Sequence, residues 1–152
     1  KFEEADFFVA IGNNNIRRKY IELLKGKQLN IISLIHPSSY IGKNVAIGFG
    51  TSVHQNVVIN TDSTIGIGCI INTSSIIEHE NSIEKFVHMS PNTCTGGQVN
   101  IGDETWIGLG TGIINNISIC DKVVVGAHSL VLKNINKMGT YIGNPVNRIE
   151  DK

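Results

Sequence analysis

Aliphatic residues recur at every sixth position through most of the chain. Starting at Ile35, positions spaced by six hold Ile or Val in fifteen of seventeen repeats, which end at Asn136 without one shift of register. The position four residues further on is also restricted, because nearly all of its occupants are small or β-branched. A period of six matches neither the 3.6-residue period of an α-helix nor the two-residue alternation of an ordinary strand.

The period fits a short strand followed by a corner. Three such sides close a triangular coil of eighteen residues, and coils would stack at the spacing of neighbouring strands, about 4.8 Å. The aliphatic column would fill the interior, and the small column would fit where a corner leaves little room. Glycine directly after the aliphatic residue, as at Gly42, Gly66 and Gly96, would supply a positive φ or a close backbone approach. Residues 35–136 therefore predict a mainly β fold, a parallel β-helix of nearly six coils.

A different pattern precedes the repeats. Residues 7–12 form an apolar run typical of a buried strand, and asparagines at 13–15 offer an N-cap. Residues 16–25 have helical spacing and end at Gly26, a plausible C-cap. A second strand at 29–35 would complete a β-α-β unit that runs into the first coil. The apolar side chains of one helix side are Ile16, Tyr20, Leu23 and Leu24.

Composition narrows the possible partners and location. The 13 Lys and Arg residues balance the 13 Asp and Glu residues, so net charge favours neither nucleic acid nor an anionic membrane as a partner. No run approaches the roughly 20 apolar residues of a membrane span, and no secretory signal is apparent. Cys69, Cys94 and Cys120 form no CxxC or Cys/His cluster, so we expect neither disulfides nor a zinc site. A reducing cytoplasm is the simplest location.

Three segments carry a family resemblance: FFVAIGNNNIRRKY at 7–20, LIHPSS at 34–39, and INTSSIIEHENSIEKFVHMSPNTCTGGQVNIG at 71–102. Together with the repeats they resemble the hexapeptide-repeat acyltransferases, in particular the bacterial UDP-4-amino-sugar N-acetyltransferases of the bacillosamine pathway and the sialic acid O-acetyltransferases. The resemblance implies left-handed coils, acetyl-CoA as co-substrate without a metal, a nucleotide-sugar substrate for surface glycan synthesis, and a homotrimer with active sites between subunits.

The resemblance also suggests three parts of the chain. Family members begin with a glycine-rich strand-turn-helix that binds UDP, and no such motif precedes Lys1. We therefore expect residues 1–34 to be a partial nucleotide-sugar-binding unit, residues 35–136 the β-helix, and residues 137–152 a strand and turn extension. Asn144-Pro145 predicts a turn in that extension.

Exceptions to the repeat cluster between residues 79 and 97. Met89 and Thr95 interrupt the aliphatic column, and Asn81 is the only amide in the small column. Such local exceptions tend to mark functional sites. A step of eighteen residues places His79 one coil from Gly97, so a proton acceptor and a backbone amide would meet at one edge. Acetyl transfer needs both, the first for the attacking nucleophile and the second for the developing negative charge.

The family motifs assign roles to individual residues. The EHE motif makes His79 the general base and Glu80 the carboxylate that orients it and favours its charged form. The residues expected to border the sugar are Asn72 and Glu78. The residues expected to contact the coenzyme are His88, Gly97, Ala127 and Arg148. Trp106, one coil after His88, would wall the coenzyme channel or pack at a subunit contact.

Several alternatives stay open. His79 could be a surface histidine paired with Glu80, and stacked asparagines also stabilise β-helix corners. His36 and His54 are eighteen residues apart, which fits stacked polar corners better than a metal site. His79 could serve an amine or a hydroxyl, so O-acetylation of sialic acid or another sugar is the main alternative. A γ-carbonic anhydrase-like metalloenzyme and a non-catalytic β-helix are further ones, but the first lacks histidines at the required spacing.

Outward apolar positions also predict subunit contacts. They are Phe49, Ile67, Phe86, Trp106 and Leu109.

Overall fold

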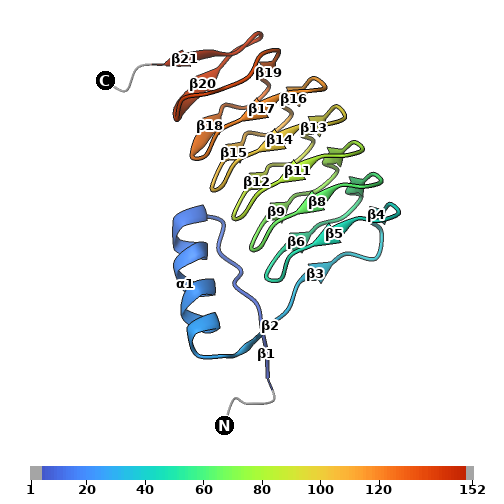
Figure 1. Cartoon of the computed structure of the whole chain (residues 1–152), viewed down its shortest axis with the longest axis vertical. Coiled ribbons are helices and arrows are strands. Elements are labelled where there is room, and N and C mark those ends of the chain that lie inside the picture. Colours follow the sequence, from blue (N-terminus) through green and yellow to red (C-terminus); the bar gives the residue numbers. More distant parts are fainter. Residues whose placement is uncertain (1–4, 150–152) are drawn as a thin grey trace.

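The computed structural model describes residues 5–149, and its main body is a stack of triangular coils (Figure 1). Each coil has three sides, which we call sides 1 to 3 in chain order. Side 1 consists of β3 (Leu34–Ile35), β6 (Ser52–Val53), β9 (Ile70–Ile71), β12 (His88–Met89), β15 (Trp106–Ile107) and β18 (Val123–Val125). Side 2 consists of β4 (Tyr40–Ile41), β7 (Val58–Ile59), β10 (Ile76–Ile77), β13 (Cys94–Thr95), β16 (Gly112–Ile113) and β19 (Leu130–Val131). Side 3 consists of β5 (Ala46–Ile47), β8 (Thr64–Ile65), β11 (Ser82–Ile83), β14 (Asn100–Ile101) and β17 (Ser118–Ile119).

The strands of each side pair in parallel at steps of eighteen residues, as Ile77 does with Thr95 and His88 with Trp106. The aliphatic and small columns both point inward and form one continuous core, in which Ile59 and Val57 are fully buried. Ile35 in the first coil is exposed, because β3 ends its sheet and no coil lies below it. The predicted parallel β-helix of about six coils is confirmed.

The corners depart from the expectation for glycine. Left-handed φ values recur every six residues, but two positions after the expected glycine, for example at Asn44, Asn56 and Glu80 with φ of 59°, 56° and 57°. Of the two roles predicted for Gly42 and its equivalents, positive φ is therefore excluded. Close backbone approach is their reason instead, because a Cβ added at Gly96 would lie 2.5 Å from the backbone nitrogen of Asn115 in the next coil.

The N-terminal residues form the predicted β-α-β unit, with shorter strands than expected. β1 (Asp6–Phe7) and β2 (Asn30–Ile31) pair in parallel, and α1 (Asn14–Gly26) connects them. Asn13 caps the helix, because its side chain accepts a hydrogen bond from the backbone N–H of Ile16 at 3.0 Å. Figure 1 shows α1 running alongside the coils, beside side 1.

The buried face of α1 is not the one that hydrophobic spacing predicts. Three of the four apolar side chains, Ile16, Tyr20 and Leu23, are 45–49% exposed, and Leu24 alone of the four packs against the core. The two buried residues of the helix are Arg17 and Ile21. Hydrogen bonding by Arg17 determines which face of α1 is buried, because all five N–H groups of its guanidinium can be paired with oxygen atoms. The hydrogen bonds run from Nε to Gly68 O (2.6 Å), from Nη1 to Ile11 O (3.1 Å) and Gly12 O (2.9 Å), and from Nη2 to Phe86 O (2.9 Å) and Asn14 Oδ1 (2.8 Å).

The N-terminal unit also covers part of the predicted contact surface. Phe86 is buried with Val9 and Ile21, and Phe49 and Ile67 pack against the same cluster. Within one chain, Phe86 is therefore buried, and Phe49 and Ile67 are partly covered. Trp106 and Leu109 stay exposed.

The C-terminal end extends side 1. β20 (Gly139–Ile142) pairs in parallel with β18, and β21 (Asn147–Ile149) returns antiparallel to β20 after the predicted turn at 143–146. Within residues 5–149, no helix has the length and apolar character needed to cross a membrane.

Replacing Arg17 by Met should destabilise the protein strongly. The change leaves the carbonyl oxygens of Gly68 and Phe86 without their guanidinium donors at a buried junction, which should cost about 2–4 kcal/mol in the free energy of unfolding. Denaturant titration measures this, with Lys19→Met on the exposed side of α1 as control. Equal stabilities of the two variants would contradict this account of how the helix docks.

Candidate active site

The predicted site residues lie at two separate places in one chain. Glu78, His79, Glu80 and Gly97 lie at the corner between sides 2 and 3, which we call the 2–3 edge. The others belong to side 1 or to the corner after it, the 1–2 edge. These are Asn72, His88, Ala127 and Arg148, the last on β21 at the end of side 1. Side 2 separates the two groups.

At the 2–3 edge, His79 and Glu80 form a hydrogen-bonded pair. His79 Nδ1 lies 3.0 Å from Glu80 Oε2, and both side chains are about half exposed. A carboxylate only accepts hydrogen bonds, so in the neutral imidazole Nδ1 carries the proton and Nε2 presents a lone pair. Glu80 Oε2 also accepts a hydrogen bond from Gln98 Nε2 at 3.3 Å, in the next coil. The pair therefore has the tautomer that a general base requires.

Gly97 lies directly against the His79 ring. A Cβ added at Gly97 would come within 2.5 Å of His79 Cε1 and 2.6 Å of His79 Nε2. The proximity predicted from the eighteen-residue step is therefore present. Only glycine lets the imidazole occupy this position without displacement.

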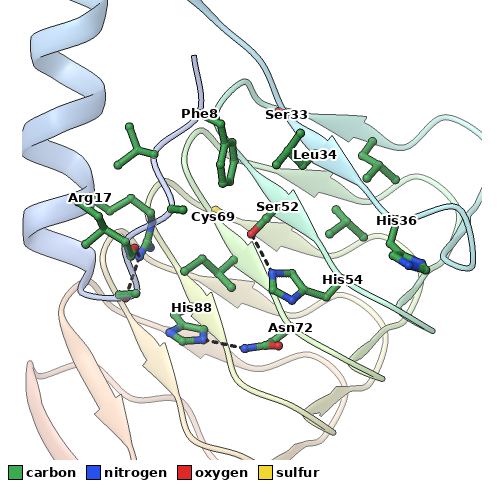
Figure 2. A pocket seen from close by; sticks show the side chains of 18 of the residues that line it. Phe8, Arg17, Ser33, Leu34, His36, Ser52, His54, Cys69, Asn72 and His88 are labelled. Atoms are coloured by element: carbon green, nitrogen blue, oxygen red, sulfur yellow. Dashed lines mark hydrogen bonds between the residues drawn. The ribbon is translucent and has the colours of Figure 1, made fainter. Parts of the chain in front are cut away.

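A pocket of about 850 Å³ lies between residues 8–12 and the outer surface of side 1 (Figure 2). Its volume falls in the range of small-molecule sites. Polar side chains in its lining include Arg17, His36, His54, Asn72 and His88. None of the described residues that line it is Asp or Glu, so the pocket suits an anionic ligand.

Among these polar side chains, Asn72 and His88 were predicted to lie at the site, whereas His36 and His54 were predicted to be stacked polar corners. His36, His54 and Asn72 follow one another at eighteen-residue steps, which predicted the shared column but not that it lines a pocket. His36 Nδ1 lies 2.9 Å from Ser38 Oγ, and His54 Nε2 lies 3.2 Å from Ser52 Oγ. No sequence pattern indicated that Arg17 lines the pocket, because its position depends on how α1 docks against the coils.

His88 is a neutral, well-fixed side chain. Burial lowers its pKa to about 4, and the charges of Arg17 and His54 contribute in the same direction. Asn72 Nδ2 donates to His88 Nε2 at 3.4 Å, as a neutral imidazole allows. The Trp106 ring stacks on His88 with ring centroids 5.7 Å apart and planes 1° apart, and Trp106 Nε1 donates to Ser90 Oγ at 2.8 Å.

Neither a reactive core cysteine nor a metal site is found among the described residues. Cys69 is fully buried, as expected for a core residue, and burial raises the pKa of its thiol to about 12. Within residues 5–149, no group of three or more His, Cys, Asp or Glu side chains could hold a metal ion.

Comparison with known proteins places this geometry in a family. No family model matches the chain. A solved structure of a perosamine N-acetyltransferase variant from Caulobacter crescentus, in complex with CoA and GDP-perosamine, superposes with a TM-score of 0.94 at 30% identity, covering 96% of this chain and 70% of that one. The chain belongs to the hexapeptide-repeat acetyltransferase family. Two further members of this family are similar to it.

The acetyltransferase domain of PglB from Neisseria gonorrhoeae, in complex with acetyl coenzyme A, has a TM-score of 0.93 at 31% identity over 95% of this chain and 70% of that one. GDP-perosamine N-acetyltransferase from Escherichia coli O157:H7 is 31% identical over 104 residues, or 68% of this chain and 47% of the relative. The chain thus matches about half the length of that curated relative.

The buried His88 should make stability fall in acid. The unfolded chain binds a proton at His88 near pH 6.5 and the folded chain only near pH 4, so the unfolded state gains protons first as pH falls. The loss of stability caused by His88 is absent above pH 6.5 and grows as pH falls from 6.5 to 4. In His88→Gln the free energy of unfolding should therefore decline less steeply over this range.

Denaturant titrations from pH 7.5 to 4.5 measure the difference, with His128→Gln at an exposed corner as control. His54, whose pKa burial also lowers, should leave a residual decline in the variant. Parallel pH curves for the parent and His88→Gln would exclude the neutral, buried state of His88.

Proposed function

We propose that the protein transfers the acetyl group of acetyl-CoA to the amine of a nucleotide-linked amino sugar, with His79 as general base. The observation that carries this proposal is the pair of His79 and Glu80 beside Gly97, in a member of the hexapeptide-repeat acetyltransferases. The relatives that act on perosamine are named N-acetyltransferases, which supports an amine as acceptor. The product would be a precursor for a bacterial surface glycan.

The proposed acetyl transfer needs a single side chain that accepts a proton and later returns it. The amine attacks the thioester carbonyl carbon, and His79 Nε2 takes the proton that the nitrogen loses. Collapse of the tetrahedral intermediate breaks the C–S bond, and the same proton passes to the departing thiolate of CoA. Glu80 holds Nδ1–H and stabilises the imidazolium between these steps, as its 3.0 Å contact allows. The Gly97 N–H is our candidate donor to the thioester oxygen.

The pocket on side 1 is our candidate for the nucleotide-sugar site. Its apolar walls suit a base and a sugar ring, and the buried Arg17 gives it positive potential for a diphosphate. Burial lowers the pKa of Arg17 to about 10, so the side chain stays charged at neutral pH. Asn72 and Glu78 are the residues proposed to border the sugar. His88, Ala127 and Arg148 are proposed to contact the coenzyme.

We further propose that two chains build each site. Side 2 separates His79 from His88 within one chain, so the two groups can meet only across a subunit contact. A three-fold ring would place the 2–3 edge of one prism against side 1 of the next and close without a free edge. The exposed Trp106 and Leu109 are the apolar side chains that such a contact would cover.

His79→Ala should abolish acetyl transfer. Turnover is measured as CoA thiol release from acetyl-CoA, with GDP- and UDP-linked 4-amino-4,6-dideoxy sugars as acceptors. Loss of a general base costs about 10²- to 10⁴-fold in kcat. Lys43→Ala, an exposed change two coils away on the same edge, is the control. Full activity of His79→Ala would refute His79 as base, and release of thiol only with hydroxyl acceptors would favour the O-acetyltransferase alternative.

Mixing two inactive variants should restore activity if sites are shared. In trimers co-expressed from His79→Ala and His88→Ala chains, about a quarter of the sites would combine an intact His79 with an intact His88 from a neighbour. We expect about a quarter of the parent kcat per site, where each variant alone has almost none. Co-expressed chains that stay inactive would rule out a site between subunits.

A further inference from the structure

Several hydroxyls of the small column make the same pair of hydrogen bonds. At four positions the hydroxyl donates to the carbonyl fifteen residues later and accepts from the backbone N–H eighteen residues later; these are Thr51, Ser63, Thr105 and Thr111. Thr105, for example, donates to Cys120 O at 3.1 Å and accepts from Val123 N at 3.3 Å. Thr111 repeats the pair of hydrogen bonds with Gly126 O and Ser129 N. We call this pair the ladder bonds, because they tie each coil to the next.

Asn81 makes the ladder bonds and adds others. Its Nδ2 donates to Gly96 O at 3.0 Å, and its Oδ1 accepts from Val99 N at 3.2 Å. An amide has two hydrogens where a hydroxyl has one, so Nδ2 also contacts Glu78 O and His79 O, the latter at 3.2 Å, and one hydrogen is shared between two of the three acceptors. The added hydrogen bonds end on the backbone of two candidate site residues.

Thr95, the polar exception in the aliphatic column, acts on the same backbone. Its Oγ1 accepts from Glu78 N at 3.3 Å. In the coils below and above, the equivalent amides of Asn60 and Gly96 donate to backbone carbonyls, those of Ile77 and Ile113. Both polar exceptions therefore bond to the segment that carries His79.

The added hydrogen bonds of Asn81 are not needed to satisfy the carbonyl oxygens that accept them. Glu78 O also accepts from Ser63 Oγ at 2.9 Å, and His79 O accepts from Gln98 N at 3.0 Å. The His79 ring is half exposed and lies against Gly97. Its orientation therefore depends on how firmly the backbone of residues 78–80 is held.

We propose that Asn81, assisted by Thr95, is a positioning residue for His79. Asn81 holds the backbone of residues 78–80 from inside the coil, so that the imidazole stays against Gly97 and bonded to Glu80. The inference rests on the proposed function in one respect, which is that His79 is the base. It also explains why an amide is buried where the other described coils place a hydroxyl, a thiol or an aliphatic group.

Asn81→Thr separates positioning from stability. Threonine occupies this column elsewhere and can keep the ladder bonds, but it loses the added hydrogen bonds to Glu78 and His79. We expect kcat to fall about 10- to 100-fold, the effect of a small displacement of a catalytic group, with KM values within about twofold of the parent. The melting temperature should be unchanged or higher. Thr95→Val should change kcat in the same direction.

Thr105→Val is the matched control, because it removes ladder bonds at the corner between sides 3 and 1, away from His79. It should lower the melting temperature and leave kcat unchanged. An Asn81→Thr protein with parent kcat, or one that loses activity only in proportion to its folded fraction, would overturn the inference.

A second measurement keeps this inference distinct from the proposed function. Amide hydrogen exchange at residues 78–80 in the unliganded protein reports on the segment whether or not any sugar is acetylated. We expect exchange about tenfold faster in Asn81→Thr and no change in Thr105→Val. If the parent shows no turnover, the proposed function fails and exchange alone decides the positioning role. Parent-like exchange in Asn81→Thr would overturn it.

Discussion

The stacking of coils in strict register is the constraint on which the rest of the structure depends. Interior side chains of each coil pack directly on those of the next, and the strands hydrogen-bond at steps of eighteen residues on all three sides. A shift of one residue would turn aliphatic side chains outward and break all three sheets together. The same register brings His79 against Gly97 and His88 against Trp106, so the core packing and the site geometry have one cause.

The N-terminal unit is held to this stack by a different interaction, a buried cation. Arg17 has no carboxylate partner among its hydrogen-bond acceptors, which are carbonyl and amide oxygens. A buried charge is tolerated only when its donors are satisfied, so the guanidinium requires both coil corners and the segment at 11–12 in place. Arg17 thereby fixes the docking of α1 and forms part of one wall of the pocket. Its positive charge also contributes to the low pKa of His88.

The period of six was enough to predict the β-helix, because neighbours in a solenoid lie at a fixed sequence separation. It was also enough to place His79 beside Gly97 and His88 beside Trp106. The buried face of α1 was mispredicted because burial there follows hydrogen bonding by Arg17, whereas the apolar Ile16, Tyr20 and Leu23 lie on the exposed side. The pocket could not be predicted, since its walls meet only after the N-terminal unit docks.

The three-sided coil also restricts how such a chain can change in length. Adding or removing six residues keeps the aliphatic column inside, but it moves every later residue round to the next side. Such a change between Asn72 and His88 would carry His88 and its stacked Trp106 away from the pocket while the core stayed filled. Within the regular repeat, only a whole coil of eighteen residues preserves both the core packing and the side on which each later residue lies. Insertions into the coils themselves are therefore tolerated only in steps of eighteen residues, whereas a loop that projects from a corner has no such restriction.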